Sequence, residues 1–220
     1  RALAIAQRYQ LPEMLARVIA GRGIDIDAVD DFLDPTIRKL MPDPSTVTQM
    51  EAAAKRIADA ATRGEKVAIF GDYDVDGATS AALLAWHLRH CGLDPLIHIP
   101  DRIFEGYGPN VDAVRSLADK GATLLVTVDC GTTSIEPLHE AKKLGMDVVV
   151  IDHHQCGDEL PIVDALVNPN RPDDLSGLGH LAAVGLVFVT LVALNRELRA
   201  RHFWTNEKPE PDLLSVLHHV

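Results

Sequence analysis

The sequence is poor in cysteine and has no apolar run of membrane-spanning length, and these shortages exclude two classes of protein. Its three cysteines, Cys91, Cys130 and Cys156, show neither CxxC nor zinc-finger spacing. A disulfide-stapled secreted domain is therefore excluded, and we expect a reduced, cytoplasmic protein. The longest uncharged apolar stretch, residues 181–195, is shorter than the ~20 residues that cross a bilayer, so we expect a buried helix there and no membrane association.

Positive charge is also scarce. The chain has 21 Lys and Arg against 32 Asp and Glu, which gives a formal net charge of −11. A surface that is basic throughout, as in many nucleic-acid-binding proteins, is excluded. Affinity for a polyanion must then come from bound metal ions, a local groove or parts of the protein outside this sequence. Nucleotide-binding folds are not indicated either, because the sequence has neither a P-loop lysine motif nor G-x-G-x-x-G.

From residue 65 onward, the apolar pattern alternates between strands and helices. Continuously apolar runs predict strands at residues 67–70, 95–99, 124–128, 148–151 and 165–167. Amphipathic patterns predict helices at residues 78–90, 111–120 and 135–144, and an apolar helix follows at residues 180–199. Apolar strands that alternate with helices are typical of an α/β fold in which helices cover both faces of a parallel sheet.

The first part of the chain has a different pattern. Helical spacing occurs at residues 11–24, 26–33 and 48–63, with a proline-rich stretch before the last of these. We therefore expect a short helical N-terminal segment, residues 1–64, that packs on the core. A catalytic domain is expected at residues 65–220.

Three carboxylates follow the first predicted strand: Asp72, Asp74 and Asp76. Two like charges about 4 Å apart repel each other by roughly 4 kcal/mol at an effective dielectric constant near 20. A hard cation relieves this repulsion, and aspartates that hold a metal ion at a strand-to-helix turn are typical of phosphate chemistry. The cluster therefore predicts a cation site.

The other strand ends carry related side chains. Arg102 follows the second predicted strand, Asp129 the third, and Asp152, His153 and His154 the fourth. Right-handed connections bring the carboxyl ends of parallel strands to one edge of the sheet, where ligands bind. Clustered Asp and His residues at such an edge indicate a metal or catalytic site.

Two other motifs were weighed for residues 72–77. They match the first half of a calcium loop, D-x-D-x-D-G, but Leu83 occupies the position of the bidentate glutamate, and a strand precedes the motif. This interpretation is rejected. The Asp-x-Asp formed by Asp74 and Asp76 is also found in phosphatases with an aspartyl nucleophile, and that alternative stays open.

Thr79 and Ser80 lie near the start of the helix that follows the cluster. Small residues at a helix start allow a phosphate to approach the free backbone N–H groups, so we expect both residues to contact substrate phosphate. Simpler roles stay open for residues taken singly. Asp129 could cap a helix, and Arg102 could form a surface salt bridge with Glu105.

Four ordered motifs resemble those of the DHH phosphoesterases: residues 71–80, 99–110, 128–131 and 152–154. The second motif and the Asp-Cys-Gly at residues 129–131 are more similar to the RecJ-type exonucleases than to other members of that superfamily. Those members include oligoribonucleases, pyrophosphatases and cyclic-dinucleotide phosphodiesterases. The resemblance covers nearly the whole chain.

The resemblance implies a metal-dependent 5′-to-3′ exonuclease that hydrolyses single-stranded DNA to mononucleotides in DNA repair and recombination. It implies Mn²⁺ or Mg²⁺ as cofactor, with two ions in the intact enzyme. The implied partners are single-stranded DNA, single-strand-binding protein and a helicase, and we expect a monomer. A small-substrate phosphoesterase and a catalytically silent domain that binds metal or a partner stay open.

The resemblance also implies roles for individual residues. The implied metal ligands are Asp74, Asp76, Asp129 and His153, and the implied catalytic residues are Asp76, Asp129, His153 and His154. Asp152 would hold these groups in place, and Asp72 would do the same or bind the metal itself, with the supporting role favoured. Arg102 and His154 would contact the substrate phosphate. The family has a further aspartate motif that this sequence lacks, so we expect an N-terminal fragment with one metal ligand missing.

Overall fold

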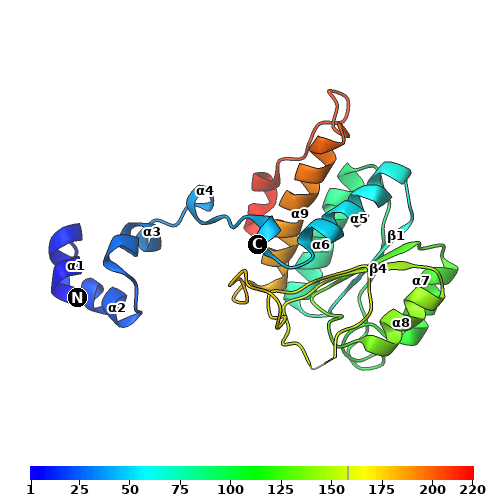
Figure 1. Ribbon diagram of the computed structural model, residues 1–220, viewed down its shortest axis with the longest axis horizontal. Helices are drawn as coiled ribbons and strands as arrows, with labels where there is room; N and C mark the ends of the chain where they lie inside the picture. Colours follow the sequence, from blue (N-terminus) through cyan, green and yellow to red (C-terminus); the bar gives the residue numbers. More distant parts are fainter. Residues whose placement is uncertain (158) are drawn as a thin grey trace. The chain divides into compact units, whose positions relative to one another are not determined.

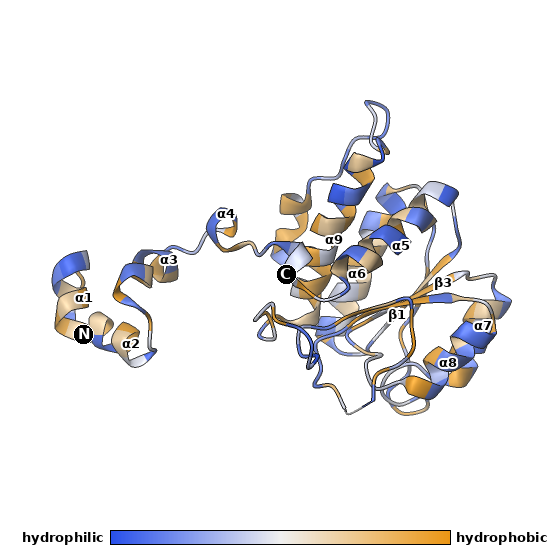
Figure 2. Cartoon of the chain, viewed as in Figure 1, coloured by the Kyte–Doolittle hydropathy of each residue, from blue (hydrophilic) through white to orange (hydrophobic). Residues whose placement is uncertain are grey.

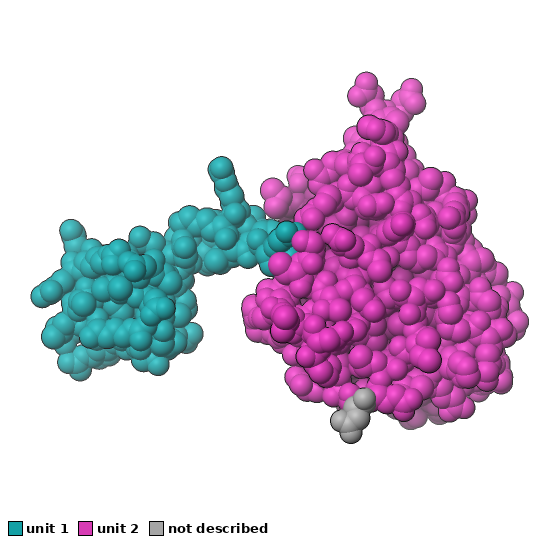
Figure 3. Space-filling view, viewed as in Figure 1, with its two compact units in different colours: residues 1–43 teal, residues 44–220 magenta. Residues whose placement is uncertain are grey.

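The computed structural model describes residues 1–157 and 159–220, apart from the side chain of residue 219. The chain divides into two compact units, Arg1–Asp43 and Pro44–Val220, which Figure 3 colours teal and magenta. Each unit is described by itself.

The first unit consists of short helices. They are α1 (Ala2–Tyr9), α2 (Glu13–Gly21), the 3-10 helix η1 (Ile26–Ala28), α3 (Val29–Leu33) and α4 (Ile37–Leu40). Helix α1 packs against α2, and the small core between them contains Ile5, Ala16, Ile19 and Val29. The predicted helices at residues 11–24 and 26–33 correspond to α2 and to η1 with α3, whereas α1 was not predicted.

The second unit is built on a five-stranded parallel sheet. Its strands are β1 (Val67–Gly71), β2 (Leu96–His98), β3 (Leu124–Val128), β4 (Asp147–Ile151) and β5 (Ala165–Val167). Their order in the sheet is β2-β1-β3-β4-β5. All five predicted strands are therefore present.

Helices cover both faces of this sheet (Figure 1). On one face lie α5 (Met50–Arg63), α6 (Val75–His90) and α9 (Ala183–Ala200), and α9 packs against both of the others. On the other face lie α7 (Val111–Asp119) and α8 (Ile135–Lys143), which pack against each other. The 3-10 helices η2 (Pro44–Thr46) and η3 (Leu213–His219) complete the unit. The predicted α/β fold is confirmed.

Most strand residues are apolar and buried, as the orange strands in Figure 2 show, because helices cover both faces of the central strands. Phe70, Leu125 and Val148 belong to a core that also contains Val114 of α7 and Leu138 of α8, and all five are fully buried. The intervening strand residues face the opposite layer, because side chains alternate along a strand. The sheet is thus a rigid platform for the loops at its edge.

The strand order places a topological switch point between β1 and β3. The connection through α6 leads from β1 to its neighbour β2, whereas the next connection returns across β1 to β3. The loops after β1 and β3 therefore leave in opposite directions and open a crevice at the carboxyl ends of these strands, where ligands of such sheets bind. Asp72 and Asp129 follow these two strands directly.

Helix α5 belongs to the second unit. It packs against α9 and β5 and buries Met50 and Ile57 completely. The division between the compact units therefore falls after Asp43, earlier than the boundary after residue 64 that the sequence pattern indicated. The apolar run predicted to be a buried helix is α9, which buries most of its apolar side chains. Within the described residues, no helix has the length and apolar character that crossing a membrane requires.

Candidate metal centre

The Asp-x-Asp-x-Asp-Gly segment folds as a sharp turn between β1 and α6. The Asp74 carboxylate caps α6 and accepts a hydrogen bond of 3.0 Å from the Gly77 N–H. This bond lowers the pKa of Asp74. A Cβ atom at Gly77 would overlap the backbone of Asp72, so only glycine allows the helix to begin this close to the strand. The local sequence thus places the three carboxylates at one turn.

Asp72 is 3% exposed, and burial raises the pKa of its carboxyl. Its Oδ1 atom is buried and has no hydrogen-bond partner in the described part of the chain. Buried carboxylate oxygens without a partner are costly, and a metal ion is one of the few groups that satisfies them. Asp72, Asp74 and Asp129 each offer an oxygen atom, and these atoms all lie within 4.8 Å of one another.

Asp129 lies at the end of β3 with its backbone in the left-handed region, at φ 61°. It is 1% exposed, and burial together with the charges of Asp76 and Asp74 raises the pKa of its carboxyl to about 8. A carboxylate crowded by others in this way is stabilised as an anion only by a nearby cation. Asp129 therefore occupies the centre of the acidic cluster.

His153 turns one ring nitrogen toward this cluster. Its Nδ1 atom lies 2.9 Å from the carbonyl oxygen of Leu181. A carbonyl can only accept a hydrogen bond, so Nδ1 carries the proton, and a neutral ring presents a lone pair at Nε2. Nε2 lies 3.2 Å from Asp129 Oδ1 and 3.6 Å from Asp76 Oδ2. A lone pair and two carboxylates converge only where a cation or a proton lies between them.

Asp76 is held by the start of α9. Its two carboxylate oxygens accept hydrogen bonds from the backbone N–H groups of Ala183, at 2.7 Å, and Val184, at 2.8 Å. The Asp76 carboxylate thus lies at the positive end of the α9 dipole. Nothing in the sequence pattern indicated this contact, because its partners lie 107 and 108 residues away along the chain.

Asp152 lies behind both histidines. Its Oδ1 atom accepts hydrogen bonds from the His153 N–H and from His154 Nδ1, each at 2.8 Å. Its Oδ2 atom accepts a bond of 3.0 Å from the Thr132 N–H. Burial opposes ionisation, but the hydrogen bonds from His154 and Thr132 prevail and lower the pKa of Asp152 to about 2. The bond to Asp152 in turn raises the pKa of His154.

Asn168, at the end of β5, holds the backbone of the two histidines. It is fully buried, and its Nδ2 donates hydrogen bonds of 2.9 Å to Thr132 Oγ1 and to the His154 carbonyl. Its Oδ1 accepts a bond from the Asn170 N–H, and the Asn170 side chain donates to the His153 carbonyl. Neither asparagine was a predicted site residue. The only signal in the sequence is the polar Asn-Pro-Asn directly after an apolar strand.

Tyr107 was also missed, because its flanking glycines indicate only a tight turn. Its hydroxyl donates a hydrogen bond of 3.2 Å to the Asp129 carbonyl and lies 3.1 Å from His154 Nδ1. The ring of Tyr73 meets Tyr107 edge-on, with 6.4 Å between the ring centres. The Arg102 guanidinium lies over the Tyr73 ring, 5.1 Å from its centre. Two aromatic rings thus connect the exposed Arg102 side chain to the histidines.

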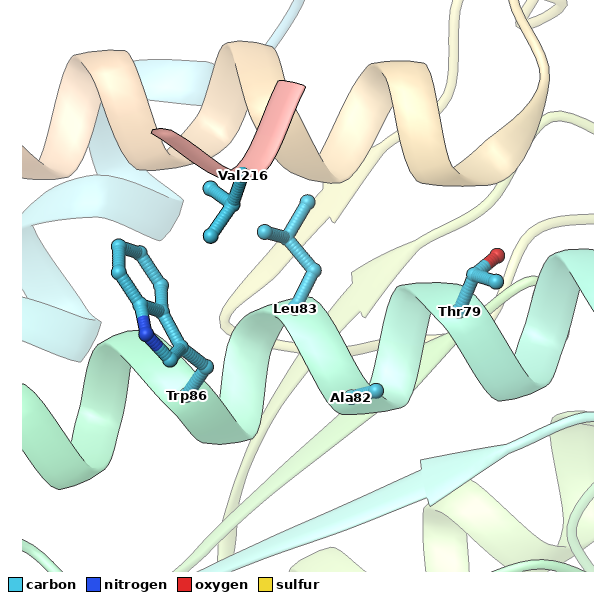
Figure 4. Close-up of a pocket in the computed structure, with 5 residues that line it drawn as sticks. All are labelled: Thr79, Ala82, Leu83, Trp86 and Val216. Carbon is cyan, nitrogen blue, oxygen red and sulfur yellow. The ribbon is translucent and has the colours of Figure 1, made fainter. Parts of the chain in front are cut away.

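Thr79 and Ser80 lie in the second turn of α6. The Thr79 hydroxyl donates to the Val75 carbonyl of its own helix at 2.7 Å. Figure 4 shows Thr79 along a pocket between α6 and η3, which Trp86 and Val216 also line. Ser80 is fully buried. These positions give no support to the predicted contacts with substrate phosphate.

The donor set fits a hard divalent ion. Carboxylate oxygens predominate, and His153 Nε2 adds one imidazole nitrogen. The second group whose ligand atoms lie within 4.8 Å of one another consists of Asp129, His153 and His154. Oxygen ligands with a single imidazole suit Mn²⁺ and Mg²⁺ better than soft metals. Cys130 is buried, and burial raises the pKa of its thiol well above the usual value, so it is a poor ligand.

Comparison with known proteins supports this interpretation of the site. Residues 66–217 match the model of the N-terminal domain of the DHH family. The single-stranded-DNA-specific exonuclease RecJ of Bacillus subtilis is 36% identical over 195 residues, which are 89% of this chain and 25% of that protein. RecJ of Escherichia coli is 34% identical over 200 residues, which are 90% of this chain and 34% of that protein.

Solved structures agree with these relatives. A crystal structure of exonuclease RecJ bound to manganese is 34% identical, with a TM-score of 0.64, over 69% of this chain and 38% of that one. RecJ from Thermus thermophilus in complex with Mn²⁺ is 26% identical, with a TM-score of 0.71, over 90% of this chain and 27% of that one. The chain therefore spans between a quarter and about two fifths of the length of these proteins. Its fold, its ordered motifs and the family match over residues 66–217 together show that the chain belongs to the DHH family.

Proposed function

We propose that the protein containing this chain is a metal-dependent 5′-to-3′ exonuclease that hydrolyses single-stranded DNA to mononucleotides, in DNA repair and recombination. The observation that carries the proposal is the convergence of His153 Nε2 with the carboxylates of Asp129 and Asp76, at 3.2 and 3.6 Å, beside the buried Asp72 carboxylate. The similarity to RecJ exonucleases supports the choice of substrate.

Asp74, Asp76, Asp129 and His153 would hold Mn²⁺ or Mg²⁺, and the unpartnered Oδ1 atom of Asp72 would be a further ligand. A bound pair of such ions would lower the pKa of a water molecule and neutralise charge on the attacked phosphate. The chain's own contribution is to fix these ligands before substrate arrives. The Leu181 carbonyl orients His153, and the first N–H groups of α9 orient Asp76. Such fixed ligands need little reorganisation during the reaction.

His154 and Arg102 are proposed to bind the substrate phosphate. The hydrogen bond to Asp152 raises the pKa of His154, which favours positive charge on this side chain beside the carboxylate cluster. The Arg102 side chain is exposed, and the Tyr73 ring supports one face of its guanidinium. A planar guanidinium suits a phosphate group because it can donate two parallel hydrogen bonds.

We further propose a cytoplasmic monomer that works with single-strand-binding protein and a helicase. The scarcity of cysteine supports the compartment. The similarity to RecJ, a single-stranded-DNA-specific exonuclease, supports a single DNA strand as the shared substrate.

The proposal is tested with the full-length protein that contains this chain. We expect Mn²⁺-dependent release of mononucleotides from 5′-phosphorylated single-stranded DNA, measured by chromatography of the products. A dinucleotide is the comparison substrate, and faster hydrolysis of the dinucleotide would identify a small-substrate phosphoesterase instead. His153→Ala should lower the rate at least about 100-fold, because loss of a ligand costs more than loss of the groups that orient it. Unchanged hydrolysis by that variant would refute the metal assignment.

A further inference from the structure

Residues 101–106 form a rigid turn between β2 and α7. The Asp101 carboxylate accepts hydrogen bonds from the N–H groups of Ile103, at 2.8 Å, and Phe104, at 3.1 Å. The Glu105 carboxylate accepts bonds from the Asp101 N–H, at 2.9 Å, and from the Asn110 side chain, at 3.3 Å, and it lies 2.8 Å from His98 Nε2. Both carboxylates of the turn are thus engaged within the turn and with its neighbours, which fixes its shape.

This turn presents apolar side chains to solvent. Phe104 is 87% exposed and Ile103 is 85% exposed. A large aromatic side chain that gains nothing from burial in the fold is a candidate contact for a ligand. Arg102, the proposed phosphate-binding residue, lies in the same turn two residues before Phe104. The turn therefore carries a guanidinium and an aromatic ring at a short, fixed separation along the chain.

Phe104 lines an open groove of about 540 Å³ between the turn and the start of α7. The groove is also lined by Asn110, Asp112 and Ser116. Its lining residues in the described structure include the carboxylates of Asp112 and Glu105 and no lysine or arginine. An anionic phosphate backbone would be repelled from such a surface. An uncharged aromatic heterocycle with amino groups would not be repelled, because the Asp112 carboxylate and the Ser116 hydroxyl can accept hydrogen bonds from it.

From these observations we infer that the groove beside Phe104 binds one unpaired nucleobase, which stacks on the Phe104 ring while Arg102 binds a phosphate of the same strand. The inference rests on the proposed function and deepens it, because it names a contact that only a single strand can make. Inside a duplex, both faces of a base are stacked on the neighbouring base pairs, whereas an unpaired base can turn a face to the ring. The groove thereby contributes to selection of single strands independently of the metal ligands.

The experiment uses the full-length protein and 5′-phosphorylated oligonucleotides, with binding measured in EDTA so that metal-dependent hydrolysis does not occur. Phe104→Ala should weaken binding about 5-fold or more, since stacking of one base on an aromatic ring is worth roughly 1–3 kcal/mol. Phe104→Trp should bind within about 2-fold of the unchanged protein. Ile103→Ala is the matched control, because this neighbour is equally exposed and does not line the groove.

A series of oligonucleotides with a single abasic residue locates the base. At one position, an abasic residue should weaken binding to the unchanged protein as much as the Phe104→Ala substitution weakens binding of the intact strand. The Phe104→Ala variant should bind that abasic strand as tightly as it binds the intact strand. A fluorescent 2-aminopurine at that position should be quenched on binding to the unchanged protein and not to Phe104→Ala. Since Phe104 is exposed, the variant should keep its thermal unfolding midpoint.

The inference fails alone if the unchanged protein binds and hydrolyses single-stranded DNA while Phe104→Ala behaves like Ile103→Ala. It also fails alone if no abasic position loses its effect in Phe104→Ala. If the unchanged protein neither binds nor hydrolyses single-stranded DNA, the proposed function fails and the inference falls with it.

Discussion

At the scale of single residues, Asp129 combines a left-handed backbone, a buried side chain and a position among other carboxylates. Its backbone has φ 61°, its side chain is 1% exposed, and its carboxylate lies at the centre of the acidic cluster. Among non-glycine residues, Asp and Asn adopt the left-handed conformation most readily. Asparagine therefore removes the charge at this position while it keeps the shape of the side chain and the conformation of the backbone.

Asp129→Asn should lower the affinity for Mn²⁺ at least about tenfold, because the neutral amide replaces an anionic ligand. Without metal, the variant should be no less stable than the unchanged protein, since burial and the neighbouring carboxylates already oppose ionisation of Asp129 and raise its pKa to about 8. Calorimetric titration with Mn²⁺ and thermal unfolding in EDTA measure the two effects. Asp119→Asn, at an exposed carboxylate, is the control. An unchanged Mn²⁺ affinity for Asp129→Asn would contradict the ligand assignment.

A pair of glycines tests the turn after β1. Gly77→Ala should destabilise the protein by ~3 kcal/mol or more, because its Cβ atom would overlap the Asp72 backbone. Gly185→Ala, inside α9 where a Cβ atom has room, should stabilise it by about 0.5–1 kcal/mol. Urea denaturation gives both values. Equal effects from the two substitutions would show that the turn does not need glycine.

The candidate ligands could be predicted from the sequence because each of them directly follows a recognisable apolar strand. The groups that hold them could not, because Tyr107, Asn168 and the Leu181 carbonyl reach the site only through the tertiary fold. The expectation for Thr79 and Ser80 assumed a helix that starts at residue 78. Since Asp74 caps the helix, α6 starts at Val75, and its free N–H groups lie before Thr79.

At the scale of secondary structure elements, α6 and α9 are joined by a buried polar pair. His87 Nε2 lies 2.7 Å from Asn195 Oδ1, and His87 is fully buried. Burial lowers the pKa of His87 to about 4 from its ordinary value of 6.5. The folded state therefore binds fewer protons than the unfolded state between these two pH values. The stability contributed by neutral His87 is complete above about pH 6.5 and is lost as the pH falls toward 4.

We expect the free energy of unfolding to fall by about 2 kcal/mol when the pH falls from 7.5 to 5.0, because over this range residue 87 gains a proton in the unfolded state and stays neutral in the folded state. Urea denaturation at both pH values measures the change. In His87→Gln, the difference between the two pH values should shrink by that amount. His139→Gln, at an exposed histidine, should leave the difference as it is in the unchanged protein. The same pH dependence in all three proteins would refute the role of His87.

The bounds of strands that are buried on both faces could be predicted accurately from their apolar runs. The bounds of short or exposed elements could be predicted only less accurately or not at all. The predicted strand at residues 124–128 coincides with β3, whereas the one at residues 95–99 shortens to the edge strand β2. Helix α1 was missed because it buries only Ile5 and has no side-chain cap. Its stability comes from packing against α2, which no local pattern reveals.

At the scale of the whole molecule, all candidate metal ligands belong to the second compact unit. The division between the compact units falls after Asp43, whereas the sequence pattern indicated a domain boundary after residue 64. The sequence pattern changes at residue 65 from helices alone to alternating strands and helices. That change marks the first strand rather than the start of the core, because α5 already packs against α9.

The second unit should bind metal without the first. Residues 44–220 expressed alone should fold and bind Mn²⁺ within about 3-fold of the affinity of residues 1–220, since each unit has its own core. Saturating Mn²⁺ at 100 times its dissociation constant should stabilise either protein by ~2.7 kcal/mol. Calorimetry and thermal unfolding measure these effects. A shorter chain that is unfolded, or that binds Mn²⁺ much more weakly, would contradict the division.

The contact between Asp76 and the start of α9 has a consequence for biosynthesis. A ribosome releases the acidic turn after β1 more than a hundred residues before it releases Ala183 and Val184, which hold the Asp76 carboxylate. The nascent chain therefore exposes its aspartates long before the rigid geometry of the site exists. Tight metal binding can begin only when most of the domain has been translated, so this contact makes metal uptake a late event in the maturation of the protein.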